Sequence, residues 1–109
     1  MMELNRKYVF HIPLCKFEND DLGPIDIDGL LDDLIRKFSQ RGFEGFYITK
    51  SKAYYKSRCF DELLLTMFAD CDEPEEIFAE WFTANNDVLG QEAFAWEMGN
   101  SLFIEELLD

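Results

Sequence analysis

No lysine or arginine follows Arg58, so the last 51 residues carry no basic side chain. All ten basic residues lie up to that point, together with nine of the 23 acids, and the other fourteen acids follow it. The second half therefore holds a charge near −14, more than the net charge of −13 of the whole chain. This balance argues against a protein that binds nucleic acid by neutralising phosphates or that docks on anionic membranes.

Cysteine pairs, long apolar runs and glycine-rich motifs are also missing. The three cysteines form no CxxC pair, which excludes a zinc ribbon or a thioredoxin-like motif and favours a reduced, cytoplasmic protein. The longest apolar run, residues 63–69, is far short of the roughly 20 residues of a membrane span. Residues 1–14 show no secretory signal pattern. No phosphate-binding glycine loop is present, and we expect neither a cofactor nor a metal.

The sequence gives little support for a catalytic nucleophile or a metal site. The single histidine, His11, lies four residues before Cys15, which is about 13 Å along a strand, so the two side chains would not touch. The acidic stretches at 26–29 and 70–73 lack the ligand spacing of a calcium loop, and each opens an expected helix. We therefore expect no catalytic residue of these kinds.

Apolar side chains are abundant despite the charge. Hydrophobic residues make up 48% of the 109 residues and aromatics 16%, including 11 phenylalanines. This is enough to build a packed core, and the length fits one domain over residues 1–109.

The apolar spacing predicts the elements in turn. Alternation at period two predicts a strand over residues 8–17, interrupted near Pro13, and polar residues 18–24 predict a loop. Helical spacing predicts a helix over residues 27–41, followed by Gly42. The other predicted elements are a strand at 43–55, a helix from Pro74 to about residue 85, and strands at 91–98 and 101–107 joined by a Gly99-Asn100 turn.

Residues 60–69 fit either a buried strand or a short helix, and their position between a strand and a loop favours the strand. The element order then matches the ferredoxin-like βαββαβ plan. We predict an α+β domain with an antiparallel sheet, two helices on one face and an extra C-terminal strand. An architecture of this kind does not by itself define a function.

The acidic half suggests a binding function. Acids near the start of a helix stabilise its dipole, and a solvated helix face explains part of the pattern, but stable surfaces normally mix charges of both signs. We predict a non-catalytic protein that binds a basic surface on a partner, in its sharpest form a nucleic-acid mimic that inhibits a nuclease, restriction enzyme or CRISPR effector. The predicted partner-binding residues are Asp72, Glu73, Glu76, Glu80, Asp87, Glu97, Glu105 and Glu106.

An alternative is a ferredoxin-like dimer that encloses an apolar small-molecule pocket and acts as an enzyme. A convergent polar group such as His11 or Tyr54 would support it. Lysines and tyrosines between residues 47 and 58 are typical of a protected sheet edge, and they could also contact the acidic half of a second copy.

Overall fold

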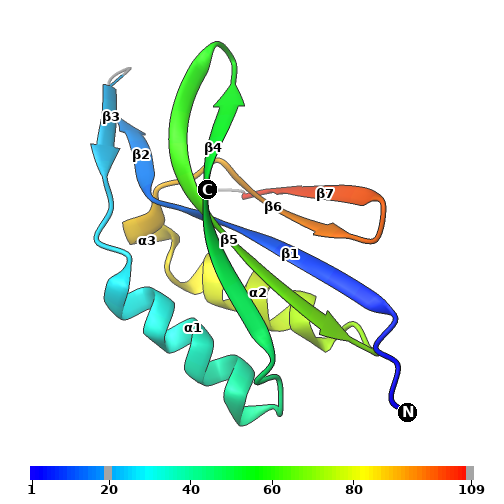
Figure 1. The fold of residues 1–109 in the computed structure, drawn as a ribbon. Coiled ribbons are helices and arrows are strands. Elements are labelled where there is room, and N and C mark those ends of the chain that lie inside the picture. Colours follow the sequence, from blue (N-terminus) through cyan, green and yellow to red (C-terminus); the bar gives the residue numbers. More distant parts are fainter. Residues whose placement is uncertain (19–20, 108–109) are drawn as a thin grey trace.

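The computed structural model describes residues 1–18 and 21–107. Along the chain the elements are β1 (Arg6–Pro13), β2 (Cys15–Glu18), β3 (Asp21–Pro24), α1 (Asp28–Gln40), β4 (Phe46–Tyr55), β5 (Arg58–Ala69), α2 (Glu73–Ala84), α3 (Asn86–Leu89), β6 (Ala93–Met98) and β7 (Ser101–Glu106). The protein is thus of the α+β class, with helices and strands as Figure 1 shows. Among the described residues, no helix is long and apolar enough to cross a membrane.

Five strands form one antiparallel sheet in the order β4-β5-β1-β6-β7. β1 lies at its centre and pairs with β5 from Arg6↔Ala69 to Pro13↔Glu62, and with β6 around Val9↔Glu97. β4 and β5 are longer than the other strands, so the hairpin that they form extends beyond the rest of the sheet (Figure 1). β2 and β3 make a separate two-stranded sheet.

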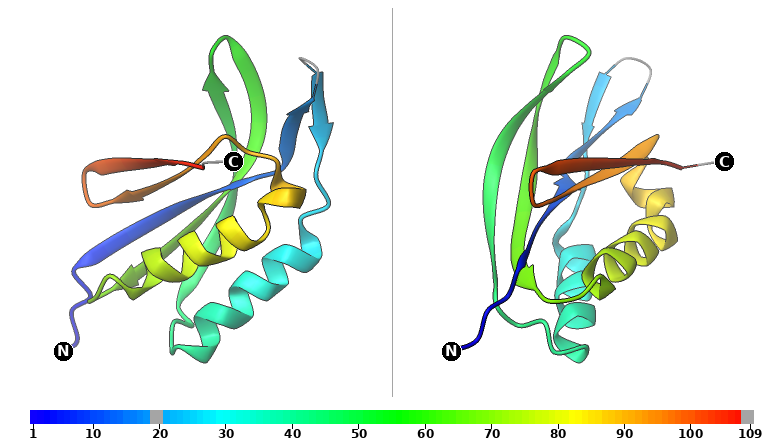
Figure 2. Two further views of the ribbon diagram at one scale, coloured as in Figure 1. Left: turned by 180° about the vertical axis from the view of Figure 1, so that it is seen from behind. Right: turned by 90° about the vertical axis from the view of Figure 1, so that its right-hand side faces the viewer.

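The helices cover one face of the five-stranded sheet (Figure 2). Tyr8, Phe10 and Ile12 alternate along β1 and are fully buried on this face, where the ring of Phe10 stacks on that of Phe38 in α1. Trp81 of α2 is also buried, and its indole nitrogen donates to the carbonyl of Leu30 at 2.9 Å. This hydrogen bond links the two long helices above a largely aromatic core.

Most predicted elements are confirmed. The helix predicted at 27–41 is α1, and Gly42 follows it with φ of 87°. Residues 60–69 lie in strand β5, and Gly99 is part of the turn between β6 and β7.

One local prediction is confirmed, one needs correction and one element was missed. The interruption predicted near Pro13 is confirmed, because β1 ends at Pro13 and β2 begins at Cys15, and proline cannot donate to a ladder. Residues 21–24 are strand β3 rather than loop, because this short segment without alternation pairs with β2 through its backbone. Residues 19–20 of the predicted loop lie outside the described residues. The four-residue helix α3 was not predicted, since four residues are too few to reveal a helical period.

Candidate active site on the open face of the sheet

The face of the sheet opposite the helices carries a histidine between two glutamates. His11 alternates with the buried residues of β1 and so points away from the helices. Glu62 lies opposite Pro13 on β5, and Glu97 lies opposite Val9 on β6. Each glutamate is thus the diagonal neighbour of His11 on an adjacent strand, a position from which long side chains interact.

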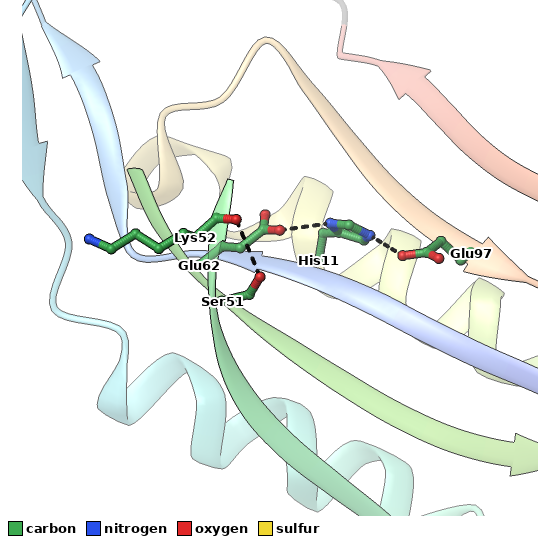
Figure 3. Close-up of polar contacts among 5 residues, drawn as sticks. All are labelled: His11, Ser51, Lys52, Glu62 and Glu97. Atoms are coloured by element: carbon green, nitrogen blue, oxygen red, sulfur yellow. Dashed lines mark hydrogen bonds and ion pairs between the residues drawn. The ribbon is translucent and has the colours of Figure 1, made fainter. Parts of the chain in front are cut away.

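Both ring nitrogens of His11 contact a carboxylate (Figure 3). Nδ1 lies 3.2 Å from Oε1 of Glu62, and Nε2 lies 2.7 Å from Oε2 of Glu97. Glu62 is the most buried of the three, with 14% of its side chain exposed against 24% for His11 and 43% for Glu97. Glu62 is therefore the carboxylate least shielded by water.

The charge of this cluster depends on the protonation of His11. When both glutamates are ionised they can only accept hydrogen bonds, and both ring nitrogens donate only in the protonated imidazolium. Burial by itself lowers the pKa of His11, but the hydrogen bonds and charges of Glu62 and Glu97 outweigh it and raise the pKa above its ordinary value. A protonated His11 between two carboxylates leaves a net charge of −1 at the site.

This arrangement predicts a pH-dependent contribution to stability. A histidine whose pKa is raised on folding stabilises the fold fully below its unfolded pKa, about 6.5, and that contribution is lost as the pH rises through the folded pKa. We expect His11→Gln to destabilise the protein more at pH 6 than at pH 9, as measured by urea unfolding at both values. Comparison with the unmutated chain at each pH removes the effect of the other acids. An equal loss at both pH values would contradict a protonated His11.

The eight predicted partner-binding acids do not form one surface. Four of them, Asp72, Glu73, Glu76 and Glu80, line a shallow cleft of about 310 Å³ along α2, together with Arg41. Glu73 accepts a hydrogen bond from Arg41 at 2.6 Å. The remaining four lie elsewhere: Asp87 on α3, Glu97 on the open face, and Glu105 and Glu106 on β7. Contact between these acids and a partner stays a prediction.

Sequence reasoning missed Glu62 as a member of any site. It treated residues 60–69 as an apolar strand, and it named His11 only as a convergent polar group of the alternative pocket, without a partner. The signal that could have indicated the site is a single glutamate within that apolar strand, since a charged side chain in a strand interior needs a partner. Glu97 was selected, but as part of an acidic surface rather than as a partner of His11.

No protein-family model and no curated protein sequence matches the chain. Among solved structures, the chain is similar to phage SAM lyase in complex with S-methyl-5'-thioadenosine, with a TM-score of 0.65 and 10% identity over 98% of this chain and 96% of that one. It is also similar to phage SAM lyase in the apo state, with a TM-score of 0.61 and 11% identity over 98% and 95% of the two chains.

These similarities correct the main functional prediction. The expectation of a non-catalytic acidic protein, with its nucleic-acid mimic and inhibitor forms, is wrong, because the structural neighbours are an enzyme that holds a small nucleoside ligand. The expectation that the chain is not an enzyme is overturned by the same finding. The charge pattern misled because a high density of acids does not by itself distinguish a binding protein from an enzyme. The predicted alternative, an enzyme with a small-molecule site, agrees better with these neighbours.

Proposed function

We propose that this protein is a lyase that acts on a sulfonium compound of the S-adenosylmethionine (SAM) type, with the His11–Glu62–Glu97 cluster as part of its active site. The observation that carries the proposal is a pair of carboxylates on the two ring nitrogens of His11 on the open face. The similarity in fold to phage SAM lyase along nearly the whole chain supports it.

The negative charge of the site and of the whole chain favours a sulfonium substrate. S-Adenosylmethionine bears a positive sulfonium, an ammonium and a carboxylate, so it is a cation at neutral pH. The proposed site has a net charge of −1, and the chain as a whole has −13, which attracts a cation and increases its rate of encounter. The product S-methyl-5'-thioadenosine is a neutral thioether and is held less strongly by the same carboxylates.

Cleavage of the sulfonium substrate depends on a good leaving group and needs few side chains of the protein. The bond from sulfur to the amino-acid chain breaks, sulfur keeps the electron pair, and a neutral thioether leaves. As this bond breaks, either the neighbouring carbon loses a proton to a carboxylate and a C=C bond forms, or the substrate's own carboxylate displaces the sulfur and closes a ring. Glu62 is the proposed base for the first route, and in the second route it orients the sulfonium by electrostatic attraction.

We further propose that the fold is of the ferredoxin-like type, since β4-β5-β1-β6 has the strand order of that plan and β7 extends it.

The open face also carries large exposed apolar side chains, and a second copy of the chain that covers them would enclose the site. The side chains are Tyr47, Phe68, Leu102 and Ile104, each between 45% and 65% exposed.

The test is direct formation of product. We expect the purified chain to convert S-adenosylmethionine to S-methyl-5'-thioadenosine, in proportion to protein and time, when followed by liquid chromatography with mass spectrometry. Heat-treated protein corrects for the spontaneous reaction. Light scattering on the same sample tests the second copy, since a mass of 12.8 kDa would correspond to one chain. Product formation no faster than in the heat-treated sample would refute the proposed activity.

A further inference from the structure

A second cleft lies on the helix side of the sheet, away from the open face. It has a volume of about 440 Å³ and separates the β2–β3 hairpin from the extended part of β4 and β5. Figures 1 and 2 show this hairpin standing beside the far end of the β4–β5 hairpin. The two are linked by an edge-to-face contact between the rings of Phe17 and Phe60, whose centroids are 5.8 Å apart. The cleft is therefore built by packing between the two hairpins.

Basic side chains gather at this cleft on an otherwise acidic protein. Lys50 and Lys52 line it from β4, and Asp61 lines it from β5. Lys50 and Lys52 lie opposite Leu63 and Asp61 in the β4–β5 register, so they share the face of the core residues. Figure 3 shows Lys52 directed away from Glu62 and His11. This cleft and the His11 cluster thus lie on opposite faces of the sheet.

The carboxylate of Asp61 interacts with both lysines. Nζ of Lys52 lies 3.0 Å from Oδ1 of Asp61, and Nζ of Lys50 lies 3.6 Å from Oδ2. The hydrogen bond from Lys52 holds the pKa of Asp61 below its usual range, so Asp61 is ionised. Two ammonium groups against one carboxylate leave a net charge of +1. Each ammonium has three N–H donors, so both keep donors for a further acceptor.

The other lining residues include three apolar side chains, which form an apolar wall, beside Cys15, Gly23 and Cys59. Leu14 of this wall lies between β1 and β2, Pro24 is the last residue of β3, and Phe60 comes from β5. A ligand that fits would combine an anionic end with a flat or apolar body. Lysine acts as a point charge, which suits a tetrahedral phosphate, whereas planar carboxylate recognition favours the arginine fork.

We propose that this cleft binds a small organic phosphate, with the phosphate on Lys50 and Lys52 and the organic part on the apolar wall. The site is separate from the proposed active site, because it lies on the other face of the sheet and uses none of the same residues. It does not rest on the proposed lyase activity, and either proposal can fail alone.

Titration with phenyl phosphate, followed by amide chemical shifts at low salt, tests this site. We expect shifts centred on residues 50–52 and 59–61, tighter binding of phenyl phosphate than of inorganic phosphate, and no such shifts with phenol. Lys50→Gln and Lys52→Gln should each weaken binding by about threefold or more, the range of an exposed charge interaction. Asp61→Asn should strengthen binding, because it raises the local charge from +1 to +2.

Lys7→Gln is the matched control. Lys7 is an exposed lysine on β1, outside the cleft lining, and its loss changes the net charge by the same amount. Binding should be unchanged in this variant. An equal loss in Lys7→Gln and Lys52→Gln would mean that only net charge matters, and no gain in Asp61→Asn would mean that the two lysines do not hold the phosphate. Either result overturns the proposal, as would shifts centred on any other region.

Discussion

Glu62→Gln is expected to reduce the formation of S-methyl-5'-thioadenosine by about 10²–10⁴-fold, the range over which a positioned base contributes to a rate. Glutamine has the same shape as glutamate, and its carbonyl oxygen can still accept from Nδ1 of His11, which is 3.2 Å from Oε1 of Glu62. The substitution therefore removes the charge and the basicity of the site while it keeps the packing. Steady-state assays with S-adenosylmethionine, together with a melting curve, measure both effects.

Two comparisons make the result specific. Glu97→Gln changes the other, more exposed carboxylate at the site, and we expect a smaller loss because water shields it more. Glu80→Gln removes one charge from the exposed face of α2, outside the site, and should leave the rate unchanged. The second product, formed from the amino-acid chain of the substrate, distinguishes the two routes. A product with a C=C bond indicates proton removal by a base, and a cyclic product indicates closure on the substrate's own carboxylate. Full activity of Glu62→Gln would exclude Glu62 from the reaction.

Leu34→Asp is expected to unfold the protein or nearly so. Leu34 lies on α1 and is fully buried in the core. An unpaired carboxylate at that position loses its hydration without gaining a partner, which costs several kcal/mol or more, and a domain of this kind has only about 5–15 kcal/mol of total stability. Circular dichroism and urea unfolding would record the loss of the cooperative transition.

Two further variants separate the effect of the buried charge from the effect of the lost packing. Leu34→Ala leaves a cavity without a charge and should cost about 2–5 kcal/mol. Gln40→Asp adds the same charge at the exposed end of α1, where the helix dipole makes an acid unfavourable by only about 0.3–1 kcal/mol. A cooperative melt of Leu34→Asp equal to that of the unmutated chain would contradict the placement of Leu34 in the core.

Elements whose information is local could be predicted from the order of the residues. Alternation along Tyr8, Phe10 and Ile12 defines the inner face of β1, and the helical spacing around Leu34 and Phe38 defines the inner stripe of α1. The Gly99-Asn100 pair defines a hairpin turn. Each of these patterns spans a few residues, and the hydrophobic effect acts on it wherever the rest of the chain lies.

Which side chains meet could not be predicted from local patterns and depends on the folded chain. His11 is 51 residues from Glu62 and 86 residues from Glu97, and strand register alone brings them together. The same holds for β3, a short segment without alternation that becomes a strand because β2 pairs with it. The cleft lined by Lys50 and Lys52 likewise forms because the β2–β3 hairpin packs beside β5. Register and packing depend on the sum of many distant contacts, so a local pattern that identifies a strand does not say which strand lies beside it.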